Sequence, residues 1–330
     1  MSSGLFPNTL VGKHPLQFRK NIHIVAGAAF FISLFVKFAD DDRFMNPKAS
    51  LIIGIICISF SPIFVKLAIA PPITSGFYRI FAAWVVLAPY CIIKGNLKIA
   101  RKDLLIAVLG GVVFGADIAI WNISLTKISA TISTLIANLA PVWVGLLSFL
   151  ILRKRSGLLF WVGTWVAILG MVVLVGFQNI LHLQFNIGLV YALIASLFYA
   201  IYIMITKNIL TKITTLTFMF YNMIGASVFL VIICLCRGDE LLHFSTPTWF
   251  YMIGMGLICQ LAGWITINYS LHFLPATKVS IALLSQTVIA GIWAALLLHE
   301  TLDFKEIAGS VIVLAGIAVT FLKRTAVNNS

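Results

Sequence analysis

Charged side chains are scarce in this sequence. Asp, Glu, Lys and Arg make up 10% of its 330 residues, and only 10 residues are acidic, whereas a soluble domain carries charge at about a quarter of its positions. Hydrophobic residues reach 61%, and the mean hydropathy is +1.06. A soluble fold of this length cannot bury so much apolar surface. The composition therefore argues against a soluble enzyme or a disordered scaffold and predicts a polytopic membrane protein.

Motifs for catalysis, metal binding and nucleotide binding are lacking as well. There is no Walker-type phosphate loop, no His-Glu-x-x-His and no pair of intramembrane aspartates. The five cysteines show no metal-type spacing. We therefore expect no metal, no cofactor and no ATP. A membrane-embedded enzyme is the alternative to a transporter from a different class, and the missing motifs argue against it. A passive channel is the third interpretation.

Long apolar runs, by contrast, are abundant. Ten runs are bounded by charged or turn-forming residues, and a helix needs about 20 residues to cross a bilayer. Because no backbone polar group can stay unpaired in lipid, and the runs exceed the length of a barrel strand, every span is expected to be helical. The predicted spans are 50–69, 73–93, 104–122, 129–152, 158–177, 186–206, 214–235, 248–270, 279–298 and 307–322.

The formal net charge of +13 is spread unevenly between the loops. Loops on one side of the predicted spans carry 14 Lys and Arg residues, and loops on the other side carry 3. Membrane proteins retain basic residues in their cytoplasmic loops, so the charge indicates orientation rather than nucleic-acid binding. The ten-helix core is predicted to lie in the plasma membrane, as in a bacterial inner membrane, with its N- and C-termini in the cytoplasm.

Residues 1–47 form an N-terminal extension that does not fit the ten-helix plan. Its segment 22–39 is apolar but contains His23 and Lys37. The segment is either an eleventh span with its N-terminus outside or an interfacial anchor, or else Met45 is the natural start. We favour the last two interpretations over an eleventh span, because of the charge distribution.

The second half of the chain repeats the first at an offset of 146 residues. The segments 121–125 and 267–271 match in this frame, and so do the Gly163–Gly309 and Gly170–Gly316 pairs. A unit of five helices is odd, so two tandem copies must cross the membrane in opposite directions. The predicted fold is all-α, with two inverted five-helix repeats over 48–178 and 184–324 and a tail over 325–330. Inverted repeats are typical of secondary transporters.

Several motifs resemble those of one family. They are Ser59-Phe-Ser-Pro-Ile-Phe-Val-Lys66, Phe77-Tyr-Arg79, Asp117-Ile-Ala-Ile-Trp-Asn-Ile-Ser124 and Leu298-His-Glu-Thr-Leu302, and they resemble EamA-type members of the drug/metabolite transporter superfamily over about residues 48–324. The resemblance implies transport of amino acids, other metabolites or toxic amphiphiles, with export more frequent than uptake. Two departures stand out: Lys154 replaces an acidic residue that the family commonly has, and Thr287 replaces the repeat partner of Pro141.

Two ionisable residues are predicted to lie inside spans at matching depth. Arg79 lies about 10 Å and Asp117 about 9 Å below the outer edge of consecutive antiparallel helices. Charges inside a membrane are costly. An Arg79–Asp117 pair is therefore either a static bridge between two helices or part of a substrate path, in which Asp117 is the candidate proton acceptor.

Amides and aromatic residues complete the candidate site. Asn138 and Gln260 lie near the middle of their spans, Gln286 is the nearest counterpart of Asn138 in the second half, and Pro141 is expected to bend the helix that carries Asn138. These amides either join helices or contact substrate. Trp121, Trp264 and Tyr202 lie within spans and either pack or line an aromatic pocket suited to amphipathic organic solutes.

The leading functional prediction is a secondary transporter for a small organic metabolite, amino acid or drug-like solute. It would work by alternating access. Its predicted partners are the solute and the lipid bilayer, and it is predicted to be a monomer or a homodimer. Export is favoured slightly over uptake. An uptake permease is the alternative within the same class.

Overall fold

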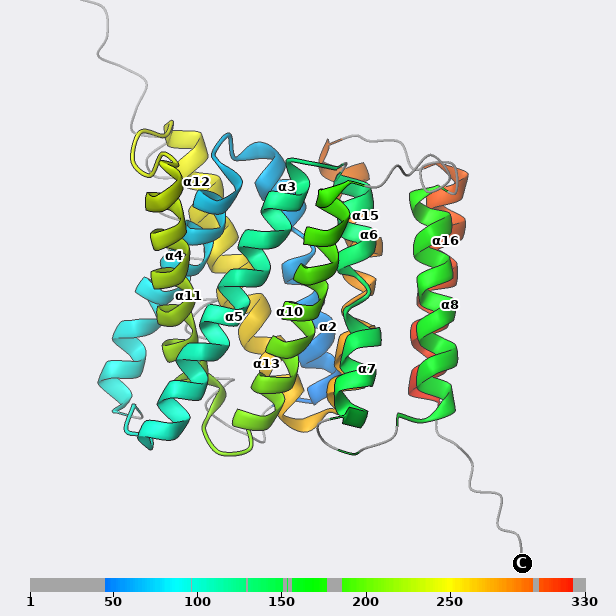
Figure 1. Ribbon diagram of the computed structural model, residues 1–330, viewed down its shortest axis with the longest axis horizontal. Helices are drawn as coiled ribbons and strands as arrows, with labels where there is room; N and C mark the ends of the chain where they lie inside the picture. Colours follow the sequence, from blue (N-terminus) through cyan, green and yellow to red (C-terminus); the bar gives the residue numbers. More distant parts are fainter. Residues whose placement is uncertain are drawn as a thin grey trace, which may run out of the picture.

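The structure, a computed structural model, describes residues 45–95, 97–128, 130–150, 153, 156–176, 186–298 and 303–322. These residues contain ten helical spans that are long and apolar enough to cross a membrane, which confirms the predicted number. The segment 22–39, residues Lys154 and Glu300, and the tail 325–330 lie outside the described residues. Figure 1 shows the spans running side by side.

Each half contributes five spans. In the first half they are formed by α2 (Pro47–Ile58) with α3 (Ser61–Leu67), α4 (Pro72–Lys94), α5 (Arg101–Leu125), α6 (Ala130–Ala137) with α7 (Ala140–Leu150), and α8 (Leu158–Val175). In the second half they are formed by α10 (Ile187–Ile209), α11 (Thr215–Arg237), α12 (Thr246–Met255) with η1 (Gly256–Gly263) and α13 (Trp264–Phe273), α14 (Ala276–Ala282) with α15 (Ser285–Leu298), and α16 (Phe304–Phe321).

The fourth span of each half is interrupted near its middle. In the first half the break lies between α6 and α7, and Pro141 is the second residue of α7, where a missing N–H costs nothing. The bend expected at Pro141 is therefore present. The second half has the same break between α14 and α15 without a proline, and there the Ser285 hydroxyl donates to Ala282 O at 2.7 Å. A side-chain hydrogen bond to a helix carbonyl competes with the backbone hydrogen bonds of the helix, and so it interrupts this span as proline does in the first half.

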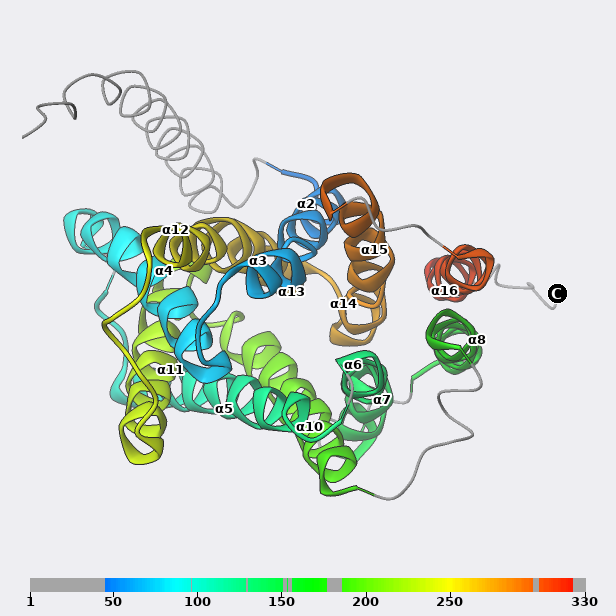
Figure 2. The same cartoon turned by 90° about the horizontal axis from the view of Figure 1, so that it is seen from above.

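The fifth spans, α8 and α16, pack against each other through glycines. A Cβ on Gly163 would lie 2.5 Å from Gly316 O, and one on Gly170 would lie 2.9 Å from Gly309 O. The two helices therefore run antiparallel at a spacing that only small residues allow. Under the offset of 146, Gly163 maps onto Gly309 and Gly170 onto Gly316, so the contact maps onto itself. This is the contact expected where a two-fold axis relates the repeats, and Figure 2 shows the α8–α16 pair set to one side of the other helices.

The second spans, α4 and α11, also occupy equivalent places, although their sequences reveal no clear repeat. Arg79 is the eighth residue of α4, and Asn222 is the eighth residue of α11. A Cβ on Gly256 would meet Arg79 O at 2.9 Å, while in the other half a Cβ on Gly111 would collide with Asn222 O. The backbone of each second span thus approaches the third span of the opposite half. Arg79 therefore lies between the two repeats.

Candidate substrate-binding site

The guanidinium group of Arg79 is held at two points inside the bundle. Its Nε donates to Gln260 Oε1 at 3.1 Å, and its Nη1 donates to Ser61 Oγ at 3.3 Å. The partners come from η1 and from the start of α3, so Arg79 of α4 joins three helices. Gln260 is 1% exposed, while Arg79 keeps an intermediate accessibility although protein surrounds it. The accessible part of Arg79 therefore faces space within the bundle.

Asp117 lies on α5 within electrostatic range of Arg79, but the two groups form no ion pair. Ion pairs within 4.0 Å among the described residues are Lys212–Asp103, Arg237–Asp239 and His243–Glu240. Asp117 lies close enough to Arg79, Tyr199 and Tyr202 for electrostatic influence, and it too remains partly accessible deep within the protein. The static bridge considered from the sequence is thus not formed in this structure. The Arg79 and Asp117 side chains instead lie in the same interior region without an ion pair.

An aromatic cluster surrounds this region. Trp264 lies 5.0 Å from Phe114, 5.4 Å from Tyr202 and 6.1 Å from Tyr199 between ring centroids, in edge-to-face arrangements. Tyr202 is fixed because its hydroxyl accepts a hydrogen bond from Asn268 Nδ2 at 3.3 Å. Tyr202 and Trp264 are almost fully buried. The rings thus form a rigid apolar wall beside Asp117.

The helix that carries Gln260 has an unusual conformation. Residues Gly256–Gly263 form a π-helix, which widens the backbone and is frequently found at functional sites. The Thr266 hydroxyl lies 2.8 Å from both Ala262 O and Gly263 O, so its single O–H can donate to one or be shared between these carbonyls of the irregular turn. A serine on α2 adds support, because Ser50 Oγ donates to Thr266 O at 2.8 Å. The sequence thus holds the irregular turn in place with short hydroxyl side chains.

The other predicted residues lie at two further places. Asn138, at the break between α6 and α7, donates through Nδ2 to Thr287 Oγ1 of α15 at 3.3 Å, and Gln286 precedes that threonine. None of the described contacts joins these two amides to Arg79 or Asp117. Trp121 lies one turn beyond Asp117 on α5, and its indole N–H has no acceptor among the described residues. The predicted set therefore divides into a central cluster and an inter-repeat contact.

We define the central cluster by its members on six elements, α3, α4, α5, α10, η1 and α13. They are Ser61, Arg79, Phe114, Asp117, Tyr199, Tyr202, Gln260 and Trp264. Ser61, Phe114 and Tyr199 were not predicted from the sequence as site residues. Phe114 is the repeat partner of Gln260 at the offset of 146, so the repeat itself contained the signal.

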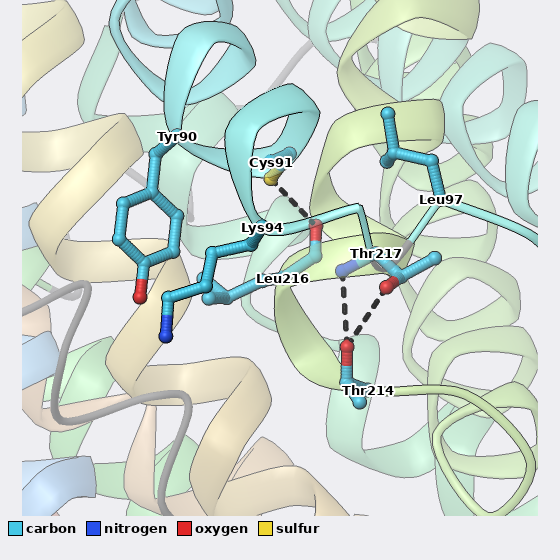
Figure 3. A pocket seen from close by; sticks show the side chains of 7 residues that line it. All are labelled: Tyr90, Cys91, Lys94, Leu97, Thr214, Leu216 and Thr217. Carbon is cyan, nitrogen blue, oxygen red and sulfur yellow. Dashed lines mark hydrogen bonds between the residues drawn. The ribbon is translucent and has the colours of Figure 1, made fainter.

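A small pocket lies elsewhere, between the end of α4 and the start of α11. Figure 3 shows its lining residues, Tyr90, Cys91, Lys94, Leu97, Thr214, Leu216 and Thr217. Its volume of about 10 Å³ is room for one water molecule, whereas ligand sites for organic molecules measure several hundred Å³. Its lining residues on α4 also lie 11 to 15 residues from Arg79, or about 16 to 22 Å along the helix. This pocket is not a substrate site.

Comparisons with known proteins agree with the fold and the general activity. The chain is 22% identical to the "Uncharacterized transporter YdfC" of Bacillus subtilis over 280 residues, which covers 84% of this chain and 91% of that protein. It is 28% identical to an "Uncharacterized transporter" of Archaeoglobus fulgidus over 276 residues, with coverage of 81% and 95%. It is 22% identical to the "S-adenosylmethionine uptake transporter" of Rickettsia prowazekii over 241 residues, with coverage of 72% and 79%.

A solved structure and a family profile complete the comparison. One crystal structure superposes with a TM-score of 0.70 at 13% sequence identity, covering 84% of this chain and 98% of the other, which shows a shared fold. The profile of the EamA-like transporter family matches residues 48–176 and 186–322, one match for each predicted repeat. The chain therefore belongs to the EamA-like transporter family and is an integral membrane transport protein.

Proposed function

We propose that this protein is a secondary transporter that moves a small organic solute by alternating access, with the central cluster as its binding site. The observation that supports this most directly is the pair of unbridged charges, Arg79 and Asp117, deep between helices of both repeats. Charged groups inside a membrane mark substrate or ion pathways, and inverted repeats place their sites at the repeat interface. Trp121, Asn138 and Gln286 would contact the solute from the neighbouring helices as the repeats move.

Solute counterflow in proteoliposomes tests this proposal. A transporter that alternates accumulates labelled solute against an unlabelled internal pool and saturates, whereas a channel only equilibrates the label. Arg79→Gln should abolish counterflow, and Arg237→Gln, an exposed arginine at the end of α11, is the matched control that should retain it. Linear, unsaturable flux or full activity of Arg79→Gln would contradict the proposal. An enzyme would instead convert the solute, which mass spectrometry of the recovered label would reveal.

We further propose that Asp117 takes up the coupling proton. Its carboxylate is partly accessible and accepts no hydrogen bond from any residue that the structure describes, so a proton can reach it. Asp117→Asn should transport by exchange but lose the response to an imposed pH gradient. Asp103→Asn on the same helix is the control, because Asp103 pairs with Lys212 at the helix start. Unchanged gradient-driven transport by Asp117→Asn would show that Asp117 does not take up the coupling proton.

Export is the proposed direction, because the family resemblance implies it. Uptake is the second candidate, and the Rickettsia relatives named as S-adenosylmethionine uptake transporters favour it. S-adenosylmethionine is therefore the first labelled solute to test. Right-side-out and inside-out vesicles measured under the same gradient should show accumulation in only one orientation. That orientation assigns the direction.

The proposed orientation places both ends of the ten-helix core in the cytoplasm of a bacterial cell. Cys236 is exposed at the end of α11, and Lys98 is exposed at the opposite end of the bundle. A membrane-impermeant maleimide should label Cys236 in intact cells. In a Cys236→Ser background, Lys98→Cys should react only after permeabilisation. The reverse pattern would invert the orientation.

The central cluster is built from one chain, so a monomer contains the complete proposed site. We propose a monomer, with a homodimer as the alternative. Light scattering of the purified protein distinguishes the two masses.

A further inference from the structure

The connection between α4 and α5 carries an exposed basic patch at one end of the bundle. We define this basic patch by its four members, Lys94, Lys98, Arg101 and Lys102. They lie within nine residues of the chain, each is exposed, and Figure 1 shows the adjoining ends of α4 and α5 at one edge of the bundle. The neighbouring acid, Asp103, pairs at 3.7 Å with a lysine of the α10–α11 loop. It therefore does not neutralise the basic patch.

The loop that presents the basic patch is anchored to a neighbouring helix. The Tyr221 hydroxyl of α11 donates to Leu97 O at 2.7 Å, and the half-buried Leu97 side chain packs against the hydrophobic core. On α4, the Lys94 amine lies 5.6 Å from the centre of the Tyr90 ring, and Figure 3 shows both side chains on the same side of the helix. Because the loop is already ordered, its cations lose little freedom when they bind one common ligand.

Other basic residues at this end of the bundle have partners within the protein. Lys207 donates to two carbonyls in the last turn of α13 at 2.9 and 2.7 Å, and Lys278 lies 5.4 Å from the centre of an aromatic ring of α16. Among the described residues, by contrast, the side chains of Lys98, Arg101 and Lys102 form no ion pair or hydrogen bond. Basic loops orient a membrane protein wherever their charges lie. Three successive cations without a protein partner on an anchored loop point to an anion outside the protein.

Exposed apolar side chains adjoin the basic patch on both helices. Ile92 and Ile93, in the last turn of α4, are 63% and 84% exposed, and Leu105, in the second turn of α5, is 62% exposed. On membrane-spanning helices such side chains contact acyl chains. A free phosphate ion would use the cations alone. A phospholipid uses both surfaces, because its phosphate meets the cations while its acyl chains cover the apolar side chains.

We propose that the basic patch and the adjoining faces of α4 and α5 bind an anionic phospholipid. The headgroup phosphate lies on the basic patch, and the acyl chains lie along Ile92, Ile93 and Leu105. Clusters of basic residues next to a membrane span attract anionic lipids in this way. Lys94 is 15 residues from Arg79, or about 22 Å along α4, so this lipid is not the transported solute. The inference goes beyond the proposed function and does not depend on it.

Lipid retention by the purified full chain, measured by native mass spectrometry, tests this proposal. The probes are cardiolipin, phosphatidylglycerol and phosphatidylcholine, each added in equal molar amount to the protein in a neutral detergent. We expect both anionic lipids to be retained at least about fivefold more than phosphatidylcholine, since a single basic residue at an anionic surface contributes about that factor. Equal retention of the three lipids would overturn the proposal.

Charge-removing variants locate the lipid on the protein. The triple variant Lys98→Gln, Arg101→Gln and Lys102→Gln should retain the anionic lipids no better than phosphatidylcholine. Its Tm in detergent without added lipid should equal that of the unmodified protein, because the three side chains are exposed. The control variant loses the same number of charges at exposed lysines elsewhere, namely Lys48, Lys127 and Lys305. Equal loss of lipid from the two variants would show that total charge attracts the lipid and would overturn the site.

Single substitutions and free phosphate complete the test. Lys98→Gln alone should weaken retention of the anionic lipids by about fivefold, which keeps the site testable if the triple variant does not fold. Inorganic phosphate at millimolar concentration should leave the lipid bound, because it does not replace the acyl-chain contacts. Displacement of the lipid by inorganic phosphate would show that the basic patch binds the free ion and would overturn the assignment to a lipid.

Discussion

The central cluster and the α8–α16 contact differ in how far the internal repeat extends to their side chains. At α8–α16 both backbone and sequence are repeated, because glycines face glycines in each half. At the central cluster the backbone is repeated but the side chains are not. Arg79 and Asn222 are each the eighth residue of a second span, although their sequence separation is 143 rather than 146. Asp117 corresponds to Gly263 at the offset of 146. Close packing depends on the repeat, whereas the chemistry of the site needs only one copy of each charge. Asymmetry within a symmetric scaffold thus marks the functional region.

The largest expected effect comes from disturbing the symmetric contact. Gly170→Leu would place its Cβ 2.5 Å from Val313 N and 2.9 Å from Gly309 O, and backbone atoms cannot yield as a flexible side chain can. We expect a loss of about 3 kcal/mol of stability, measured as a lower Tm and less monodisperse protein. Gly157→Leu, at the N-cap of the same helix with no atom within 4 Å of its added Cβ, is the control. Equal stability of the two variants would refute close packing as the role of α8–α16.

An opposite effect on stability is expected at the central cluster. Replacing Arg79 and Asp117 together by Gln and Asn removes two desolvated charges that do not pair. Replacing a buried ion pair by apolar residues is often neutral or stabilising by about 1–4 kcal/mol, and we expect the same direction where two unpaired buried charges are removed. The double variant should therefore unfold at the same or a higher temperature while it loses ligand binding, and each single variant should be less stable than the double. A large drop in Tm for the double variant would show that the charges hold the fold together.

A smaller effect is expected at the inter-repeat contact. Asn138 Nδ2 and Thr287 Oγ1 lie 3.3 Å apart, and each comes from an interrupted fourth span. A double-mutant cycle with Asn138→Leu and Thr287→Val should give a coupling of about 0.6 kcal/mol, the average for polar contacts between membrane helices. Zero coupling together with lost transport would assign Asn138 to the substrate instead.

The sequence predicted the span number and the repeat with little ambiguity. Ten apolar runs predict ten helices because the bilayer fixes the length of each span, and the offset of 146 is readable directly from Gly163 and Gly309. The Pro141 break was also predicted. The matching break at Leu283–Leu284 was not predicted. The serine whose hydroxyl bonds to a carbonyl there is a residue that also occurs in uninterrupted apolar helices.

The candidate site was predicted only in part. The structure brings together five of the predicted residues, namely Arg79, Asp117, Gln260, Trp264 and Tyr202. Their prediction rested on their charged, amide or aromatic character inside membrane spans. Asn138 and Gln286 have the same chemical character but lie at a different contact. Sequence spacing gives depth along each helix and not its rotation. It therefore could not separate residues of similar depth that face different neighbours.

By itself, the sequence determined that the part of the chain matched by the two repeats contains ten membrane-spanning helices in two opposed halves, because charge is scarce and burial in lipid needs long apolar helices. Only the tertiary structure decided that Arg79 bonds to Gln260 and Ser61 rather than to Asp117. The reason is that the rotation of each helix depends on packing between segments far apart in sequence. The close approach of Gly256 to Arg79 O, 177 residues away in the chain, sets which charges meet and which stay open to a ligand.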